Sequence, residues 1–147
     1  MIRACCLAGL LAVATTAGTG CSDASPGISV NLAGQFRRSN GGLVDLAEAN
    51  PQAWDRVCVL APYADNAAAK RLLGFDWDVE AKTAIHRNDG IALLLFVRGR
   101  DVADFIEHPR NLGDFVPQAN KCFPRANARF QQAFEAKGRP AGLYPKP

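Results

Sequence analysis

The chain has 147 residues, a formal net charge of +3, two histidines and five cysteines. This length fits a single domain once a leader is subtracted, and the small net charge argues against a nucleic-acid-binding protein. The cysteines and histidines lack the spacing of a structural zinc site, and the sequence contains no phosphate-binding glycine loop. We therefore expect no metal, no cofactor and no nucleic-acid partner.

Residues 1–20 have the pattern of a secretory signal peptide. Arg3 is the only charged residue before Asp23, and the segment from Ala4 to Gly18 is uncharged. A basic start followed by a short apolar segment is typical of export signals. The alternative, a transmembrane helix, needs about 20 predominantly apolar residues, whereas the strongly apolar part here ends near Ala14.

Cys21 follows small residues in the sequence TGCS, which resembles a bacterial lipobox. In a lipobox the cysteine is lipid-modified and becomes the mature N-terminus. One position departs from that pattern, because Gly18 stands where a lipobox usually has an aliphatic residue. The alternative is ordinary cleavage after Ala14, which leaves Cys21 as a free thiol. We favour lipid modification of Cys21, which would anchor a periplasmic domain to a membrane of the bacterial cell envelope.

Residues 21–42 are rich in serine, glycine and asparagine. This composition predicts a flexible tether between a lipid anchor and a folded domain. All four serines of the chain lie in this segment, at positions 22, 25, 29 and 39. A flexible segment cannot hold a nucleophile against a base, so the same prediction argues against serine catalysis.

The folded domain is predicted at residues 43–134, and its first part contains two strands and a helix. Residues 43–46 follow a pair of glycines and form a candidate strand. Residues 56–60 include a continuous apolar run, which predicts a strand with both faces covered. Asp65 or Asn66 then caps a helix over 66–73, and Gly74 is the residue at which the chain turns.

A hairpin is predicted at residues 91–108. The apolar run IALLLFV follows the turn signal NDG, and Gly99 fits a type II′ turn into the partner strand. Just before it, Asp76 and Asp78 alternate with aromatic residues. We interpret these two acids as the exposed side of an edge strand. The alternatives are a cation site or acid–base chemistry.

The C-terminal region has an ambiguous pattern. Phe130 and Phe134 have helical spacing, but alternating residues also predict a strand near 128–132, which we favour. Residues 135–147 contain several prolines and predict an irregular tail. The fold class is therefore α+β, with an antiparallel sheet of about four or five strands and one short helix packed on it.

The segment EHPRNLGDF is the best candidate for a working surface. His108, Arg110 and Asp114 are close in sequence and follow a strand, and binding residues tend to lie on such loops. The structural alternative is that Arg110 pairs with Asp114 and fixes the loop.

Four segments resemble a family of small bacterial envelope proteins, many of them lipoproteins. They are WDRVCVLAPY, LLGFDWD, NDGIALLLFVRGRDV and EHPRNLGDF, in this order over residues 43–130. The resemblance implies export and a single domain, but no activity, substrate or catalytic residue. It adds Trp54, Asp55 and Tyr63 to the candidate binding surface, beside His108, Arg110 and Asp114.

Cys58 and Cys122 are the two cysteines left in the predicted mature domain after Cys21 is assigned to the lipid. Exported proteins fold in an oxidising compartment, so we expect a disulfide between them. The alternative is a pair of free buried thiols. A catalytic thiol is disfavoured because apolar neighbours indicate that Cys58 is buried.

These patterns predict an exported envelope lipoprotein whose domain binds an unknown envelope protein partner. Two alternatives remain open. One is a small hydrolase that uses His108, Arg110 and Asp114, and the other is a structural envelope protein without a ligand.

Overall fold

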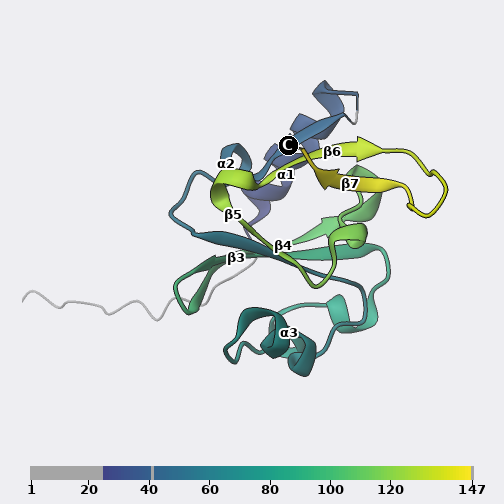
Figure 1. Cartoon of the computed structure of the whole chain (residues 1–147). Helices are drawn as coiled ribbons and strands as arrows, with labels where there is room; N and C mark the ends of the chain where they lie inside the picture. The colour runs from purple at the N-terminus through teal and green to yellow at the C-terminus, as the bar shows by residue number, and fades with distance from the viewer. Residues whose placement is uncertain (1–24, 41, 147) are drawn as a thin grey trace, which may run out of the picture.

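The structure, a computed structural model, describes residues 25–40 and 42–146, which form an α+β domain with two antiparallel sheets (Figure 1). The predicted fold class is confirmed, although the strands divide between two sheets instead of one. The predictions for the signal peptide and for Cys21 lie outside the described residues.

The larger sheet has four strands in the order β4-β3-β2-β5. In chain order these are β2 (Arg56–Leu60), β3 (Ile91–Arg98), β4 (Asp101–Pro109) and β5 (Cys122–Pro124). The smaller sheet has the order β1-β6-β7, with β1 at Leu43–Asp45, β6 at Arg129–Ala133 and β7 at Gly142–Pro145.

The helices lie on both sides of the larger sheet (Figure 1). The α-helices are α1 (Pro26–Arg38), α2 (Leu46–Ala49), α3 (Asn66–Leu73) and α4 (Val79–Lys82). Four 3-10 turns join the elements: η1 (Ile85–Arg87), η2 (Arg110–Leu112), η3 (Val116–Gln118) and η4 (Arg125–Asn127). α1, α2 and the smaller sheet cover one face, and α3 and α4 cover the other.

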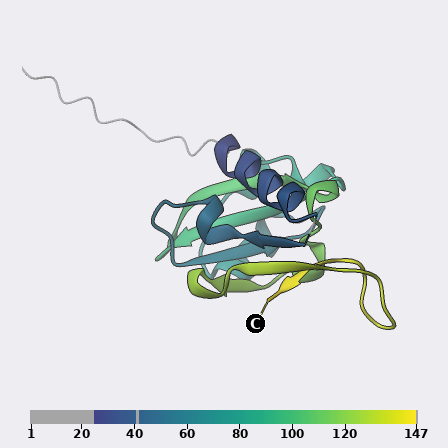
Figure 2. The same ribbon diagram turned by 90° about the horizontal axis from the view of Figure 1, so that it is seen from above.

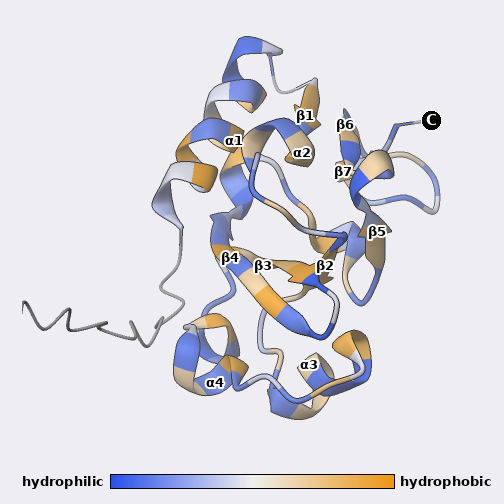
Figure 3. Ribbon diagram, turned by 90° about the vertical axis from the view of Figure 1, so that its left-hand side faces the viewer, coloured by the Kyte–Doolittle hydropathy of each residue, from blue (hydrophilic) through white to orange (hydrophobic). Residues whose placement is uncertain are grey.

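Apolar runs build β2 and β3 because both faces of these strands are buried. Val57, Val59 and Leu94 belong to a cluster on the α1 side, whereas Cys58 and Leu95 belong to a cluster on the α3 side. Figure 3 shows the hydrophobic residues concentrated on these central strands, with α1 above them and α3 and α4 below. The prediction of a strand with both faces covered is confirmed for β2.

Residues 26–38 are not a flexible tether, and that prediction was wrong over this range. They form α1, which lies along the four-stranded sheet (Figure 2). Ile28, Leu32 and Phe36 are spaced four residues apart, so one stripe of the helix packs on the α1-side cluster. Ser29 and Ser39 are therefore in or beside an ordered helix, and the argument against serine catalysis that relied on flexibility does not hold.

The elements around α3 form as the local signals predict. The carboxylate of Asp65 accepts a hydrogen bond from the amide of Ala68, and Gly74 has the left-handed conformation with φ 81°. The edge strand expected at Asp76 and Asp78 is absent, however. Asp78 caps α4 by accepting from the amide of Ala81, and the carboxylate of Asp76 pairs with Lys70 at 2.9 Å.

The predicted β3–β4 hairpin is confirmed. Gly99 has φ +61°, while Arg100 is not among the residues with positive φ, as a type II′ turn requires. A bulge opposite Phe96 and Val97 shifts the alternation along β4. After this bulge, Asp104 and His108 point to the α1 side of the sheet.

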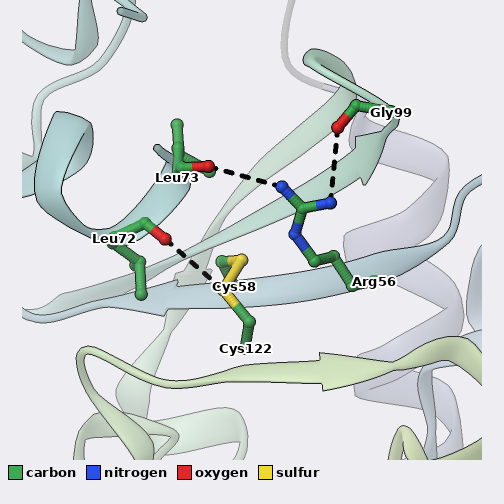
Figure 4. The surroundings of a disulfide bond; sticks show 6 residues. All are labelled: Arg56, Cys58, Leu72, Leu73, Gly99 and Cys122. Carbon is green, nitrogen blue, oxygen red and sulfur yellow. Dashed lines mark hydrogen bonds between the residues drawn. A yellow bond between two sulfur atoms is a disulfide. The ribbon is translucent and has the colours of Figure 1, made fainter. Parts of the chain in front are cut away.

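The predicted disulfide is present between β2 and β5 (Figure 4). Cys58 lies directly opposite Cys122 in the strand register, and their Cα atoms are 4.0 Å apart. The sulfur of Cys122 packs 3.8 Å from the carbonyl oxygen of Leu72 in α3. Nearby, Arg56 donates to the carbonyl oxygens of Leu73 and Gly99, which links α3 to the hairpin tip.

The strand predicted near residues 128–132 is confirmed as β6, which pairs with both β1 and β7. The tail at 135–147 is only partly irregular, because Gly142–Pro145 forms β7. The side chain of Leu143 is completely buried and belongs to the α1-side cluster. The end of the chain therefore contributes to the core.

Candidate functional site

The six residues predicted as a binding surface do not lie together. Trp54 is buried, and its ring meets Phe96 edge-on with 5.1 Å between centroids. Its indole nitrogen donates to the carbonyl oxygen of Asn50 at 2.9 Å. The carboxylate of Asp55 accepts from the amide of Gly99 at 2.6 Å. Both residues thus hold the structure near the β3–β4 turn.

Tyr63 lies beyond the opposite end of β2, on the side of α3. Its side chain is 64% exposed and its backbone has φ +65°. The amide of Tyr63 donates to the carbonyl oxygen of Ile85 at 2.8 Å, which ties the turn between β2 and α3 to η1. Tyr63 therefore shares no surface with Trp54 or Asp55.

His108 is completely buried under the loop that follows β4. Its Nε2 lies 3.1 Å from the carbonyl oxygen of Leu112, and its ring meets Phe115 edge-on. Burial lowers the pKa of His108 to about 4, against the opposing effects of backbone hydrogen bonds to Leu112 and Gly113 and of the Asp114 charge. Because the imidazole is neutral at pH 7 and faces backbone, it supports the loop from below.

Arg110 and Asp114 form the ion pair that the structural alternative predicted. One carboxylate oxygen of Asp114 accepts from Nη2 of Arg110 at 2.7 Å and from its Nε at 3.1 Å. The other carboxylate oxygen accepts from the amide of Val116, and Nη1 of Arg110 donates to the carbonyl oxygen of Asp89. The hydrogen bonds that Arg110 donates to the carboxylate of Asp114 raise the pKa of Arg110. The ion pair therefore fixes the conformation of the loop between Arg110 and Asp114.

Gly113 allows this loop to approach two other segments closely. It has φ +117°, and a Cβ atom there would lie 2.8 Å from Leu143 and 3.2 Å from Phe36. Only glycine fits both the backbone conformation and the space. The loop after β4, the end of α1 and the start of β7 therefore meet at this position.

A groove of about 560 Å³ lies where these three segments meet. Its lining comes from the end of α1, the loop after β4, and the β6–β7 hairpin: Phe36, Arg37, Asn40, Arg110, Asn111, Gly113, Asp114, Gln132, Phe134, Ala141 and Gly142. Of the six predicted residues, Arg110 and Asp114 line the groove. His108 lies beneath it, and the other three lie elsewhere.

The polar groups of the groove favour an anion. Arg37 is exposed, and its Nε donates to the carbonyl oxygen of Ala33. In the part of the chain that the structure describes, no carboxylate lies within ion-pair distance of Arg37. Its remaining donors can therefore bind a carboxylate or phosphate.

Phe36 and Phe134 supply the apolar part of the groove. Phe134 is 81% exposed, the largest exposure among the large hydrophobic side chains described. Such an exposed aromatic beside an unpaired arginine is typical of a binding surface. The sequence prediction missed Phe36 because it placed residues 21–42 in a tether, and it missed Phe134 because that segment has mixed helix and strand spacing. The spacing of Ile28, Leu32 and Phe36 was the signal that could have found the helix.

The structure offers little for hydrolysis or metal chemistry. His108 reaches a backbone carbonyl and not the groove, and Asp114 is committed to Arg110 and to the amide of Val116. Among residues 25–40 and 42–146, no group of three His, Cys, Asp or Glu side chains could hold a metal ion. His108 and Asp114 therefore do not form an acid–base pair in the groove.

Comparison with known proteins yields no relative from which a role could be transferred. No family model matches the chain, and no curated protein and no solved structure shows significant similarity to it. The resemblance to small envelope lipoproteins stays a prediction. Within the described residues, no helix is both long enough and apolar enough to span a membrane.

Proposed function

We propose that this chain is an exported lipoprotein whose α+β domain is a binding module of the bacterial cell envelope. The lipid-modified Cys21 anchors it to the membrane, and the groove between α1, the loop after β4 and the β6–β7 hairpin binds the ligand. The ligand is a segment of an envelope protein that carries a carboxylate next to an apolar side chain.

The observation that carries this proposal is the pairing of Arg37 with Phe36 and Phe134 in one groove. The unpaired guanidinium can bind a carboxylate through two hydrogen bonds. The aromatic rings can cover the neighbouring apolar group. The loop that forms the third wall is fixed by the Arg110–Asp114 pair, so this wall does not have to be ordered when the ligand binds.

A small probe tests the chemistry of the groove directly. NMR titration of the 15N-labelled domain with 3-phenylpropionate, which has one carboxylate and one ring, should shift the amide signals of groove residues. The uncharged 3-phenylpropionamide should bind more weakly, and added salt should weaken only the charged probe. Equal binding of the two probes would contradict the role of Arg37.

Crosslinking in native envelopes tests the biological partner. Arg37→Ala and Phe134→Ala should remove the crosslinked product without changing the melting temperature, because both side chains are exposed. Arg38→Ala is the matched control, since Arg38 is also exposed, carries the same charge on the same helix and does not line the groove. An unchanged product in both groove variants would contradict the proposal.

A further inference from the structure

The start of α1 lies close to the predicted lipid attachment point. Three residues separate Cys21 from Ser25. Ser25 is held on β4, because its amide donates to the carbonyl oxygen of Phe105 at 3.2 Å and its hydroxyl donates to the carboxylate of Asp104 at 2.7 Å. An extended chain spans at most about 3.6 Å per residue, so the path from Cys21 to Ser25 covers at most about 14 Å.

Several contacts fix α1 to the rest of the domain. Leu32 is completely buried in the α1-side cluster. The side chain of Gln35 donates to the carbonyl oxygen of Asp45 at 3.1 Å and accepts from its amide at 2.6 Å. Asn31 donates to the carbonyl oxygen of Ala49 at 3.2 Å. The helix therefore cannot pivot without breaking core contacts.

The groove lies at the far end of this fixed helix. With 13 residues, α1 is about 20 Å long at 1.5 Å per residue. Ser25 precedes its first turn, whereas Phe36, Arg37 and Asn40 lie at its last turn or just beyond and line the groove. Figure 2 shows the full length of α1 between these two ends.

We propose that α1 is a rigid spacer that keeps the groove away from the bilayer, so that the ligand reaches it from the aqueous phase. If α1 stood upright with the groove against the bilayer, Ser25 would lie about 20 Å from the surface. This is more than the roughly 14 Å that the chain from Cys21 can span. An upright α1 therefore keeps the groove out of end-on contact with lipid headgroups, whose phosphate would also suit Arg37. The inference rests on the proposed lipid modification of Cys21.

Distances to the bilayer test this arrangement in the full lipidated protein. The predicted mature chain has no free thiol, because Cys21 carries the lipid and Cys58 is bonded to Cys122. A donor dye is therefore placed at Gly27→Cys, at the start of α1, or at Asn111→Cys, in the groove. Energy transfer is measured to headgroup-labelled acceptors in phosphatidylethanolamine–phosphatidylglycerol vesicles. The groove dye should lie about 20 Å further from the bilayer than the helix-start dye.

A spacer variant provides the control. Inserting 20 flexible Gly-Ser residues between Ala24 and Ser25 adds a reach of about 25 Å, which should abolish most of the difference between the two dyes. Equal distances in the chain without the insert, with Cys21 shown by mass spectrometry to be acylated, would overturn the inference and leave the anchoring intact. An unmodified Cys21 would overturn both, while the binding of 3-phenylpropionate tests the groove independently.

Discussion

The two faces of the four-stranded sheet are built in different ways. The cluster on the α3 side draws all its fully buried members from residues 58–105. The cluster on the α1 side extends from Ile28 to Leu143, almost the whole described chain, and contains edge-on aromatic contacts such as Phe115–Phe130 and Phe123–Phe130.

This difference explains where the groove lies. The α3 side is closed by segments that are close to one another in the sequence and whose turns and caps are local. The α1 side is closed by segments that are far apart in the sequence, namely α1, the loop after β4 and the β6–β7 hairpin. The groove lies at the edge of that face, where side chains from these three segments meet. Binding sites often occur where separate elements meet on a rigid sheet.

The disulfide couples the two faces, and its removal should have the largest effect. Cys58 belongs to the α3-side cluster, while β5 leads through η4 into β6 on the other side. The two cysteines are 64 positions apart, and closing a loop of this length stabilises the fold by about 4 kcal/mol in the chain-entropy model. Replacing both cysteines by alanine should lower the free energy of unfolding by about this amount in urea titration.

Hydrogen exchange would sharpen that result. Amides of β6 should lose more protection than amides of α3 in the double variant, because β5 is the edge strand that the disulfide holds. Wild-type protein treated with a reductant should behave in the same way. A change below about 1 kcal/mol would mean that the crosslink has little influence on either face.

Truncating the buried stripe of α1 should have the next largest effect. Leu32→Ala should destabilise the domain by about 3 kcal/mol, because it removes a fully buried side chain from the α1-side cluster. Val30→Ala is the matched control, since Val30 is 67% exposed on the same helix. If residues 26–38 behaved as a tether, both variants would unfold at the same urea concentration as the wild type.

The buried His108 on the α1 side should make the stability of the domain depend on pH. The pKa of His108 is about 4 in the folded chain and about 6.5 when it is unfolded. Between these values the unfolded state binds more protons, so stability should fall by up to about 3 kcal/mol as the pH drops from 6.5 to 4. His108→Leu should flatten this part of the stability curve. A slope unchanged by His108→Leu would assign the acid sensitivity to other groups.

The hairpin turn should show the smallest of these effects. Gly99→Val should destabilise the domain by about 1–3 kcal/mol, because a β-branched residue is strained at φ +61°. No atom lies within 4 Å of an added Cβ, so the loss would come from the backbone conformation alone. Gly27→Ala in α1 has equal space without positive φ and should be neutral or slightly stabilising. Equal melting temperatures for Gly99→Val and the wild type would contradict the turn type.

Only part of the candidate site could be predicted from the sequence. The segment that contains Arg110 and Asp114 was identified because polar residues follow a strand and a proline there. Arg37 and Phe134 were missed, since one lay in a region of tether-like composition and the other in a segment with mixed helix and strand spacing. Trp54 and Asp55 were predicted as binding residues because they belong to a segment that resembles the envelope proteins. In the structure, Trp54 packs in the core and Asp55 binds the amide of Gly99.

The sequence by itself determined the features that depend on neighbouring residues. A run of apolar residues specified β2 and β3, Asp65 and Gly74 bounded α3, and Gly99 set the hairpin turn. The prediction of export, together with elimination among the cysteines, was enough to pair Cys58 with Cys122. In each case the physical cause is local backbone preference or burial on both faces, which a short window of sequence contains.

Only the tertiary structure decided which secondary structure forms at the two ends of the domain. The composition of residues 26–38 is compatible with a tether, and helices of this length are marginal alone. They become α1 because the sheet offers an apolar face for Ile28 and Leu32. The C-terminal segment likewise becomes β7 because β6 provides a partner strand and Leu143 finds a buried site. The groove exists because these two ends pack beside the loop after β4, a proximity that no short segment encodes.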